Sequence, residues 1–348
     1  MTDIARTFQT APAAVPRDNT AKYLDSALDS EGFACPDWLV PDLEDGTAPD
    51  MKAEALANVV DRLPEHADAF PGEIWPRVQW AYDDATAREQ GREEIRTLVD
   101  EVGEHVDGVV VPKVGRLEDV KEAAGVVADA EREFGFEDGA IGMAVIVETA
   151  AAKSDLREIS LFGANSRLDA LVFGPVDYTA ELGGRELDGE RPRWDGLLED
   201  LSNEASANDL VAIGGPFDRL FTERAGVTFY NGDGYADHVE REARVGLDGS
   251  WSLYPKQTIQ ANRIHMPTSD ELARDVRKIE AFQEAKSEGT GAVTVEGQMV
   301  DEATFKNFVN TVETVRTIDE RHPDQTAEAY DDDDDLLERA LTVDTTWD

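Results

Sequence analysis

Short runs of apolar and often β-branched residues alternate with longer amphipathic segments over most of the chain. Some of these runs, such as VVVP and GMAVIV, are almost continuously apolar, which is typical of parallel strands that are covered on both faces. The pattern predicts eight strands, at Thr7–Ala13, Trp38–Asp45, Ile74–Gln79, Gly108–Val114, Ile141–Thr149, Ala170–Tyr178, Val211–Phe217 and Ser250–Pro255. The segments of helical character between them include Met51–Leu63, Asp84–Val102 and Leu117–Phe134.

Eight strand–helix units within roughly 260 residues match the size of a (β/α)₈ barrel. The sequence therefore predicts the α/β class and a (β/α)₈ TIM barrel over residues 1–265. An open, doubly wound parallel sheet is the alternative fold, because it also alternates strands with helices.

The pattern changes after the eighth strand. The sequence predicts a charged amphipathic helix, a Gly-rich hairpin and a second helix, at Ser269–Ser287, Gly289–Val300 and Asp301–Glu320. These elements are too few for a separate domain of ordinary size, so residues 266–322 are interpreted as a C-terminal helical lid that folds onto a barrel, its own or a neighbour's. Residues 323–348 are interpreted as an acidic tail, with the run Asp331–Asp335 exposed to solvent and disordered.

The net charge of the chain indicates the ionic environment in which the protein is stable. The chain has 75 Asp and Glu against 33 Lys and Arg, a formal net charge of −42. Self-repulsion at this level destabilises a compact state in dilute buffer, whereas in about 1 M salt the Debye length falls to ~3 Å. The composition therefore indicates an intracellular protein of a salt-accumulating halophile, with an acidic protein of an ordinary organism as the alternative. An acidic surface also repels phosphates, so no nucleic-acid partner is expected.

Cysteine usage and hydropathy indicate the compartment. The one cysteine, Cys35, excludes an internal disulfide framework and fits a reducing environment. The N-terminal segment lacks a basic region followed by an apolar run, and no stretch of about 18 apolar residues occurs. We therefore expect a cytoplasmic protein with no membrane partner.

Charged residues stand at the carboxyl ends of five predicted strands, where barrel enzymes place their chemistry. They are Asp42, Glu44 and Asp45 on the second strand, Arg77 on the third, Lys113 on the fourth, Glu148 on the fifth and Asp177 on the sixth. Burial of unpaired charges is costly, so a purely apolar core does not explain them.

Two interpretations fit these strand ends equally well. Glu148 and Asp177 lie on adjacent strand ends and can form half of a Mg²⁺ site, because Mg²⁺ favours one or two protein carboxylates and takes its other ligands from water and substrate. Alternatively, the carboxylates pair with Arg77 and Lys113 in a ring of salt bridges. The spacing alone leaves both open.

Six segments over residues 6–320 resemble, in the correct order, the citrate lyase β-subunit-like family, and more narrowly the malyl-CoA/β-methylmalyl-CoA lyases of the HpcH/HpaI aldolase superfamily. They are VPDLEDGTAPDMKAEAL, WPRVQ, VIVETA, LVFGPVDYTAELGG, NGDGYADHVEREARVGLDGSWSLYPKQTIQANRIHMP and GQMVDEATFKNF. Tyr254 departs from the family pattern, which has His before Pro255, and this leaves the role of that position open. The first strand matches poorly.

The resemblance implies that Glu148 and Asp177 hold Mg²⁺, with Mn²⁺ as a possible substitute, and that the ion chelates glyoxylate or the malyl group. It implies that Arg77 stabilises the negative charge that develops on the thioester oxygen. Glu44 and Asp45 would then hold Arg77 and a metal-bound water in place.

The resemblance further implies that Asp301 on the lid is the acid/base that exchanges a proton with the acyl carbon. Asp301 also stands at the N-cap of the last predicted helix, and the two roles are compatible. Arg6, Lys22 and Pro255 would bind substrate. The alignment of Lys22 with a CoA phosphate contact is the weakest of these assignments. Since the lid of relatives covers a neighbouring subunit, a homotrimer or homohexamer is expected.

The implied activity is the reversible cleavage of malyl-CoA or β-methylmalyl-CoA to glyoxylate and acetyl-CoA or propionyl-CoA. A malate synthase of the same family, which also hydrolyses the thioester, is one alternative. A class II aldolase that does not use CoA and a non-catalytic binding subunit are the others. The lid and the WSLYPKQ segment favour a CoA substrate, and the residues Arg77, Glu148, Asp177 and Asp301 favour an enzyme.

Overall fold

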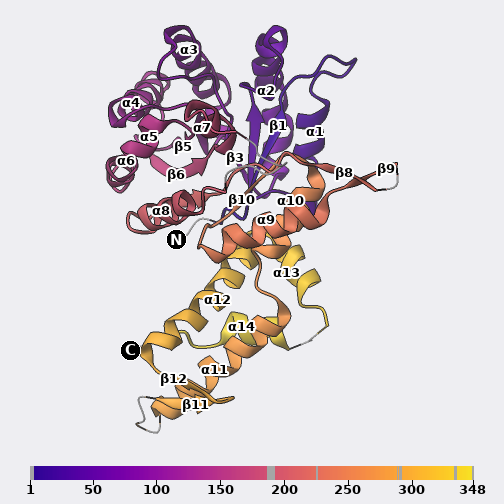
Figure 1. The fold of residues 1–348 in the computed structure, drawn as a ribbon, viewed down its shortest axis with the longest axis vertical. Coiled ribbons are helices and arrows are strands. Elements are labelled where there is room, and N and C mark those ends of the chain that lie inside the picture. The colour runs from indigo at the N-terminus through magenta and orange to yellow at the C-terminus, as the bar shows by residue number, and fades with distance from the viewer. Residues whose placement is uncertain are drawn as a thin grey trace. The chain divides into compact units, whose positions relative to one another are not determined.

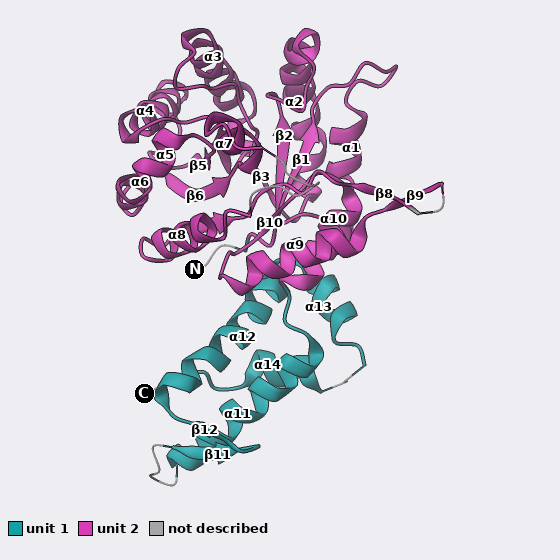
Figure 2. Cartoon of the chain, in the orientation of Figure 1, with its two compact units in different colours: residues 1–4, 266–348 teal, residues 5–265 magenta. Residues whose placement is uncertain are grey.

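The computed structural model describes residues 4–185, 193–224, 226–287, 289, 292–332 and 335–346. The chain divides into two compact units, which are residues 5–265 and residues 1–4 with 266–348 (Figure 2). The boundary coincides with the predicted end of the barrel.

All eight predicted strands are present in the first unit, and each is shorter than predicted. They are β1 (Thr7–Pro12), β2 (Trp38–Asp42), β3 (Glu73–Ile74), β4 (Gly108–Val111), β5 (Gly142–Val147), β6 (Leu168–Phe173), β7 (Val211–Ile213) and β10 (Ser250–Ser252). They pair in parallel in two sheets, with the orders β10-β1-β2-β3 and β4-β5-β6-β7.

Isolated parallel bridges join these two sheets at both edges. Arg77 bridges both Asp42 and Val110, and Ile213 bridges Gly249. The strands therefore follow one another in the cyclic order of a (β/α)₈ barrel, and the predicted fold class is confirmed.

Side chains of the strands alternate between the interior of the barrel and the layer of helices outside it. Val110 and Val172 belong to the inner apolar cluster, whereas their neighbours Val111 and Phe173 belong to the larger cluster between strands and helices. Because both faces are covered, these strands have almost no polar position, which explains the apolar runs in the sequence.

Helices follow the strands and surround them (Figure 1). They are α1 (Lys22–Leu28), α2 (Lys52–His66), α3 (Ala85–Val102), α4 (Leu117–Phe134), α5 (Ala150–Ser154), α6 (Leu156–Gly163), α7 (Pro175–Glu181), α8 (Asp195–Ser206), α9 (Gly232–Arg244) and α10 (Pro255–Ile264). The predicted bounds of α4 are correct, because Gly135 ends that helix in the left-handed conformation, with φ 86°. None of the described helices has both the length and the apolar composition needed to span a membrane.

One element of the barrel unit is absent from the sequence prediction. The connection between β7 and α9 contains an antiparallel hairpin of β8 (Phe221–Arg224) and β9 (Val227–Tyr230). Phe221 and Phe229 on this hairpin are about half exposed, at 57% and 48%. Because few of its side chains are buried, the hairpin lacks the apolar pattern by which the barrel strands were predicted.

The second unit contains the predicted lid elements. They are α11 (Ser269–Ser287), the antiparallel pair β11 (Val293–Val295) and β12 (Gln298–Val300), and α12 (Glu302–Arg321). Phe282 of α11 packs against Phe305 of α12, with 4.8 Å between the ring centroids. The two long helices thus share an apolar core.

Residues 323–348 were predicted to be an acidic tail. For the part of this segment that the structure describes, the prediction is wrong. It contains two more helices, α13 (Pro323–Ala329) and α14 (Leu336–Thr342). Leu336 and Ala340 lie four residues apart on α14 and are fully buried, as is most of Tyr330. The exposed aspartates that flank these residues dominate the composition and obscure the helical spacing. Within the run Asp331–Asp335, residues 333 and 334 lie outside the described part of the chain.

Candidate active site

Arg77 and Asp42 form a buried ion pair where β2 and β3 end. Arg77 Nε donates to Asp42 Oδ1 at 2.8 Å, and Nη2 donates to Oδ2 at 2.6 Å. Burial lowers the pKa of Arg77, but the carboxylates of Asp42 and Glu44 raise it by more. The net shift of the pKa is upward, so the guanidinium keeps its charge. This two-point contact fixes both the position and the orientation of a permanent cation.

The loop after β2 wraps around the same carboxylate. The backbone N–H groups of Glu44 and Gly46 donate to Asp42 at 2.9 and 2.8 Å. A Cβ on residue 46 would lie 2.1 Å from Asp42 Oδ2, so only glycine permits this approach. The segment Asp42–Gly46 is therefore built around the Arg77 ion pair.

Lys113 brings Glu44 and Asp45 together at the end of β4. Its Nζ donates to Glu44 Oε1 and, at 2.7 Å, to Asp45 Oδ2, and Arg77 Nη1 lies 3.4 Å from Glu44 Oε2. Burial raises the pKa of Glu44, while for Asp45 the hydrogen bonds from Lys113 and Glu44 outweigh burial and lower the pKa. Lys113 has φ 47°, a left-handed conformation that is strained for a residue with a Cβ and is typical of functional sites.

Glu148 lies at the end of β5 and is 4% exposed. The backbone N–H of Lys113 donates to its Oε1 at 2.7 Å. Burial and the nearby charge of Asp177 raise the pKa of Glu148 to about 8. A Cβ on residue 174 would lie 2.4 Å from Glu148 Oε2, so the glycine at this position makes room for the carboxylate.

Asp177 is half-buried in the first turn of α7, which follows β6 directly. Neither Asp177 nor Glu148 makes an ion pair with any side chain of the described residues. No group of three or more metal-ligating side chains was found in the described part of the chain. Two neighbouring carboxylates without a partner cation, one of which has a raised pKa, fit a divalent ion that takes its other ligands from water and substrate.

Comparison with known proteins identifies the family of the chain. The model of the family HpcH/HpaI aldolase/citrate lyase matches residues 25–193. A protein named L-malyl-CoA/beta-methylmalyl-CoA lyase, from Haloarcula marismortui, is 67% identical over 343 residues, which are 99% of this chain and 99% of that protein. The chain belongs to the HpcH/HpaI aldolase/citrate lyase family.

A malate synthase from another organism is less similar to the chain than this lyase. The malate synthase of Haloferax volcanii is 37% identical over 274 residues, which are 76% of this chain and 61% of that protein. A solved magnesium/glyoxylate complex of Haloferax volcanii malate synthase has a TM-score of 0.71 and 30% identity, and the match covers 98% of this chain and 99% of that chain. A divalent metal is thus consistent with this family.

The remaining predicted site residues of this HpcH/HpaI family member lie elsewhere. Arg6 precedes β1, at the amino ends of the strands, where it is 3% exposed and donates to both carboxylate oxygens of Asp37. The structure thus does not bring Arg6 to the other site residues, and its contacts are those of a structural ion pair. Lys22 begins α1 and Pro255 begins α10, and both are exposed on segments that follow strand ends.

Asp301 lies in the second unit. It is the N-cap of α12 and accepts a hydrogen bond from Thr304 N at 3.0 Å, in a capping box that Thr304 completes. The hydrogen bonds from Thr304 lower the pKa of Asp301. The predicted N-cap is confirmed, and the catalytic role stays a prediction.

Sequence reasoning identified Asp42 only as a charged strand end, and it gave Lys113 a role only in the alternative ring of salt bridges. It gave no role in the site to Trp251, yet Arg77 Cζ lies 5.5 Å from the centroid of the Trp251 ring. In the sequence, only the positions of these residues near strand ends indicated that they could belong to the site. The pairing itself depends on how the strands are staggered, which the sequence does not specify.

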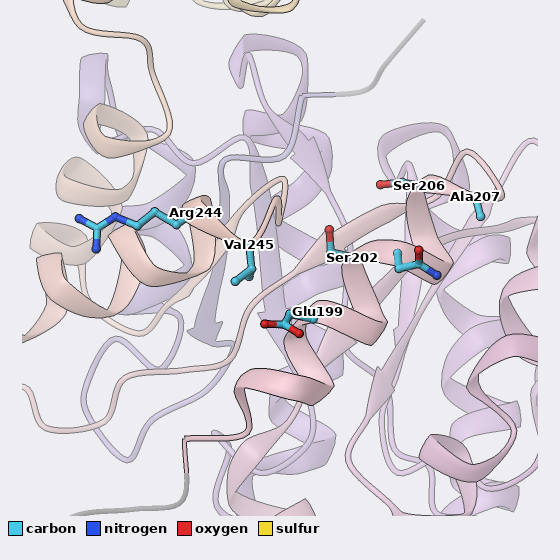
Figure 3. A pocket seen from close by; sticks show the side chains of 7 residues that line it. Glu199, Ser202, Ser206, Ala207, Arg244 and Val245 are labelled. Carbon is cyan, nitrogen blue, oxygen red and sulfur yellow. The ribbon is translucent and has the colours of Figure 1, made fainter. Parts of the chain in front are cut away.

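A polar depression on the outer surface does not belong to this site (Figure 3). It lies between α8 and the end of α9, and its side chains include Glu199, Ser202 and Arg244. Ser202 Oγ donates to Gly246 O at 3.0 Å, in the turn that leads into β10. The depression is therefore at the amino ends of the strands, opposite to the end where barrels place their chemistry.

Proposed function

We propose that the chain is a Mg²⁺-dependent lyase that reversibly cleaves malyl-CoA or β-methylmalyl-CoA to glyoxylate and acetyl-CoA or propionyl-CoA. The observation that carries this proposal is the arrangement at the strand ends. Glu148 and Asp177 lie near each other without an ion pair among the described side chains, and the fixed cation Arg77 lies near Glu148. The 67% identity to a protein of that name supports it.

Glu148 and Asp177 would hold the ion, which, when bound, acts as a Lewis acid on the oxygens of glyoxylate or of the malyl group. Mn²⁺ has similar ligand preferences and is expected to substitute. The proton on Glu148 must leave before the ion binds, since the pKa of the free carboxyl is raised to about 8.

In the cleavage direction, the C2 hydroxyl of the malyl group gives up its proton to solvent and C2 becomes the aldehyde carbon of glyoxylate. The bond between C2 and C3 breaks, and its electron pair remains on the acyl-CoA carbon. The negative charge spreads to the thioester oxygen, where Arg77 stabilises it. Asp42 holds Arg77 with two hydrogen bonds, so the cation needs no reorganisation when the charge develops. Glu44 and Asp45, which Lys113 holds together, keep the wall beside Arg77 in place.

The acyl carbon then takes up a proton, and we assign its transfer to Asp301. In the condensation direction the same carboxylate removes this proton from acetyl-CoA. The family resemblance implies that the lid covers a neighbouring subunit, and we propose that Asp301 acts on another subunit of a homotrimer or homohexamer. Lys22 and Pro255 are proposed to contact CoA, whereas Arg6 is left out because of its ion pair with Asp37.

One incubation tests the proposal. The protein is mixed with glyoxylate, Mg²⁺ and either acetyl-CoA or propionyl-CoA in molar KCl, and the products are identified by mass. A lyase forms malyl-CoA or β-methylmalyl-CoA and releases no free CoA. Release of free CoA would indicate a malate synthase, the activity named for the relative at 37% identity. Condensation of glyoxylate with pyruvate but not with either thioester would indicate an aldolase that does not use CoA.

A further inference from the structure

A second cavity lies outside the barrel wall, near the carboxyl ends of β6 and β7. Its volume is about 310 Å³, and it is bounded by the end of β6, α7, the start of α8, the segment after β7, and α9. Phe173 lines it and points into the helix layer, as its place in the outer apolar cluster shows. Glu148, by contrast, does not line the cavity.

Trp194 forms one wall of the cavity in a strained conformation. It is the N-cap of α8 and has φ 49° and ψ 28°, the left-handed region that a bulky side chain rarely adopts. Its Nε1 donates to Thr179 Oγ1 at 2.9 Å, and its ring meets the ring of Tyr178 edge-on at 5.0 Å. Backbone strain of this kind is concentrated at functional sites, where it holds a side chain in position for a ligand.

Arg241 on α9 provides an unsatisfied donor in the same cavity. Its Nε is buried and has no hydrogen-bond partner among the described residues. The nearest recorded carboxylate oxygen, Asp195 Oδ1, lies 3.6 Å away, which is too long for a hydrogen bond. A buried donor without a partner is rare in a folded protein, and its presence in a cavity wall indicates that a ligand supplies the acceptor.

The one fully buried carboxylate of the cavity, Glu242, is already satisfied by its neighbours. Glu242 accepts from Gly215 N at 3.0 Å and from Ser250 Oγ at 2.6 Å, and its Oε1 lies 3.0 Å from His238 Nε2. It therefore does not compete for Arg241. The Nη2 of Arg241 lies 3.4 Å from His238 Nδ1, whereas its Nε remains available to an anion.

We propose that this cavity binds a small organic carboxylate with a planar apolar body. The carboxylate pairs with Arg241, because a guanidinium matches the geometry of a carboxylate, and the body lies against Trp194 and Phe217. The volume is at the lower limit of ligand pockets, so a CoA thioester does not fit. The ligand is thus distinct from the proposed substrate.

Helix α7 connects this cavity with the proposed metal site. Pro175 and Thr179 of α7 line the cavity, and Asp177 lies between them in the sequence. A ligand that shifts Trp194 also shifts its partner Thr179, and with it the helix that carries Asp177. We therefore expect the carboxylate and Mg²⁺ to change each other's affinity by the same factor. This second step rests on the proposed function.

Benzoate is the probe for binding, measured in molar KCl by tryptophan fluorescence and by calorimetry. We expect a saturable signal with the wild type, at least tenfold weaker binding in Arg241→Gln, and partial recovery in Arg241→Lys, which retains the charge. Arg244→Gln is the matched control, because Arg244 lies on the same helix, is 74% exposed and pairs with Glu240. Trp194→Phe should lose the fluorescence change. Acetate and inorganic phosphate, which lack the apolar body, should bind more weakly.

Equal affinity of benzoate for the wild type and Arg241→Gln would overturn the site, as would a fluorescence change that survives in Trp194→Phe. Coupling is measured by Mg²⁺ titration with and without saturating benzoate, where we expect a change in affinity of at least about fivefold. An unchanged Mg²⁺ affinity would overturn the coupling. Benzoate binding needs no turnover, so a protein that binds benzoate through Arg241 but forms no malyl-CoA would refute only the proposed function.

Discussion

Replacement of Asp42 by asparagine should destabilise the barrel unit strongly, because Asp42 is the buried partner of Arg77. The carboxylate accepts four hydrogen bonds, two from Arg77 and one each from the backbone of Glu44 and Gly46. Asparagine has one acceptor oxygen, so its NH₂ group faces two of these donors. Removal of one partner of a buried ion pair costs about 3–5 kcal/mol.

The expected change is large enough for calorimetry in molar KCl. In a domain of this size 1 kcal/mol corresponds to ~2–4 °C, so the melting temperature of the barrel unit should fall by about 6–20 °C. Turnover should fall as well, since Arg77 loses the contact that orients it. Salt should not mask the loss, because a buried pair is screened much less than a surface pair.

Asp138→Asn is the matched control. Asp138 pairs with Arg167 at 3.1 Å but is 94% exposed, and exposed ion pairs contribute about 1 kcal/mol or less. If the melting temperature of the Asp42→Asn variant is as close to that of the wild type as the control's is, the claim that this ion pair holds the strand ends together is refuted. A lower melting temperature with normal turnover would show that Asp42 does not position Arg77 for catalysis.

Three further predictions concern metal binding, pH and salt. Glu148→Ala and Asp177→Ala should each reduce turnover by at least about 100-fold with little change in the circular dichroism spectrum in high salt, and Mg²⁺-dependent activity in either variant would contradict its assignment. Burial raises the pKa of Glu94 to about 7, so the folded state holds a proton that the unfolded state releases between pH 4.5 and 7, and stability falls as pH rises through this range. The free energy of unfolding of the Glu94→Gln variant, measured in urea, should therefore exceed that of the wild type by up to about 3 kcal/mol above pH 7 and by little near pH 4.5. A difference that does not change with pH would show that it does not come from the raised pKa of Glu94. Finally, the melting temperature should fall as KCl is lowered from molar to millimolar, since screening of the net charge of −42 is lost, and an unchanged value would contradict the halophilic interpretation.

The barrel strands were predictable because burial on both faces leaves a continuous apolar run, but their ends were not. The third strand was predicted at Ile74–Gln79, whereas β3 ends at Ile74, although Trp75 N and Arg77 N still donate to carbonyl oxygens of β2. Pro76 has no N–H to donate, so the regular pattern of hydrogen bonds is incomplete there. Beyond this proline the chain places Arg77 at the carboxyl end of the barrel.

The elements that the sequence prediction missed bury few residues. The hairpin β8–β9 has exposed faces, and α14 is short and is preceded by the run Asp331–Asp335. In both, charge and exposure conceal a short pattern of two or three apolar positions. Tertiary contacts that the sequence does not specify, such as the burial of Leu336, decide their structure.

The sequence left two interpretations of the charged strand ends open, and the structure shows which of these residues form salt bridges. Asp42, Glu44 and Asp45 follow the salt-bridge interpretation, since Arg77 and Lys113 pair with all three. These pairs use both cations, and neither Glu148 nor Asp177 forms an ion pair among the described side chains. The raised pKa of Glu148 is the consequence, because a buried carboxyl that lacks a partner cation retains its proton. The ring of salt bridges is therefore compatible with the proposed metal site: it neutralises three carboxylates, fixes Arg77, and involves neither of the two carboxylates that we propose as metal ligands.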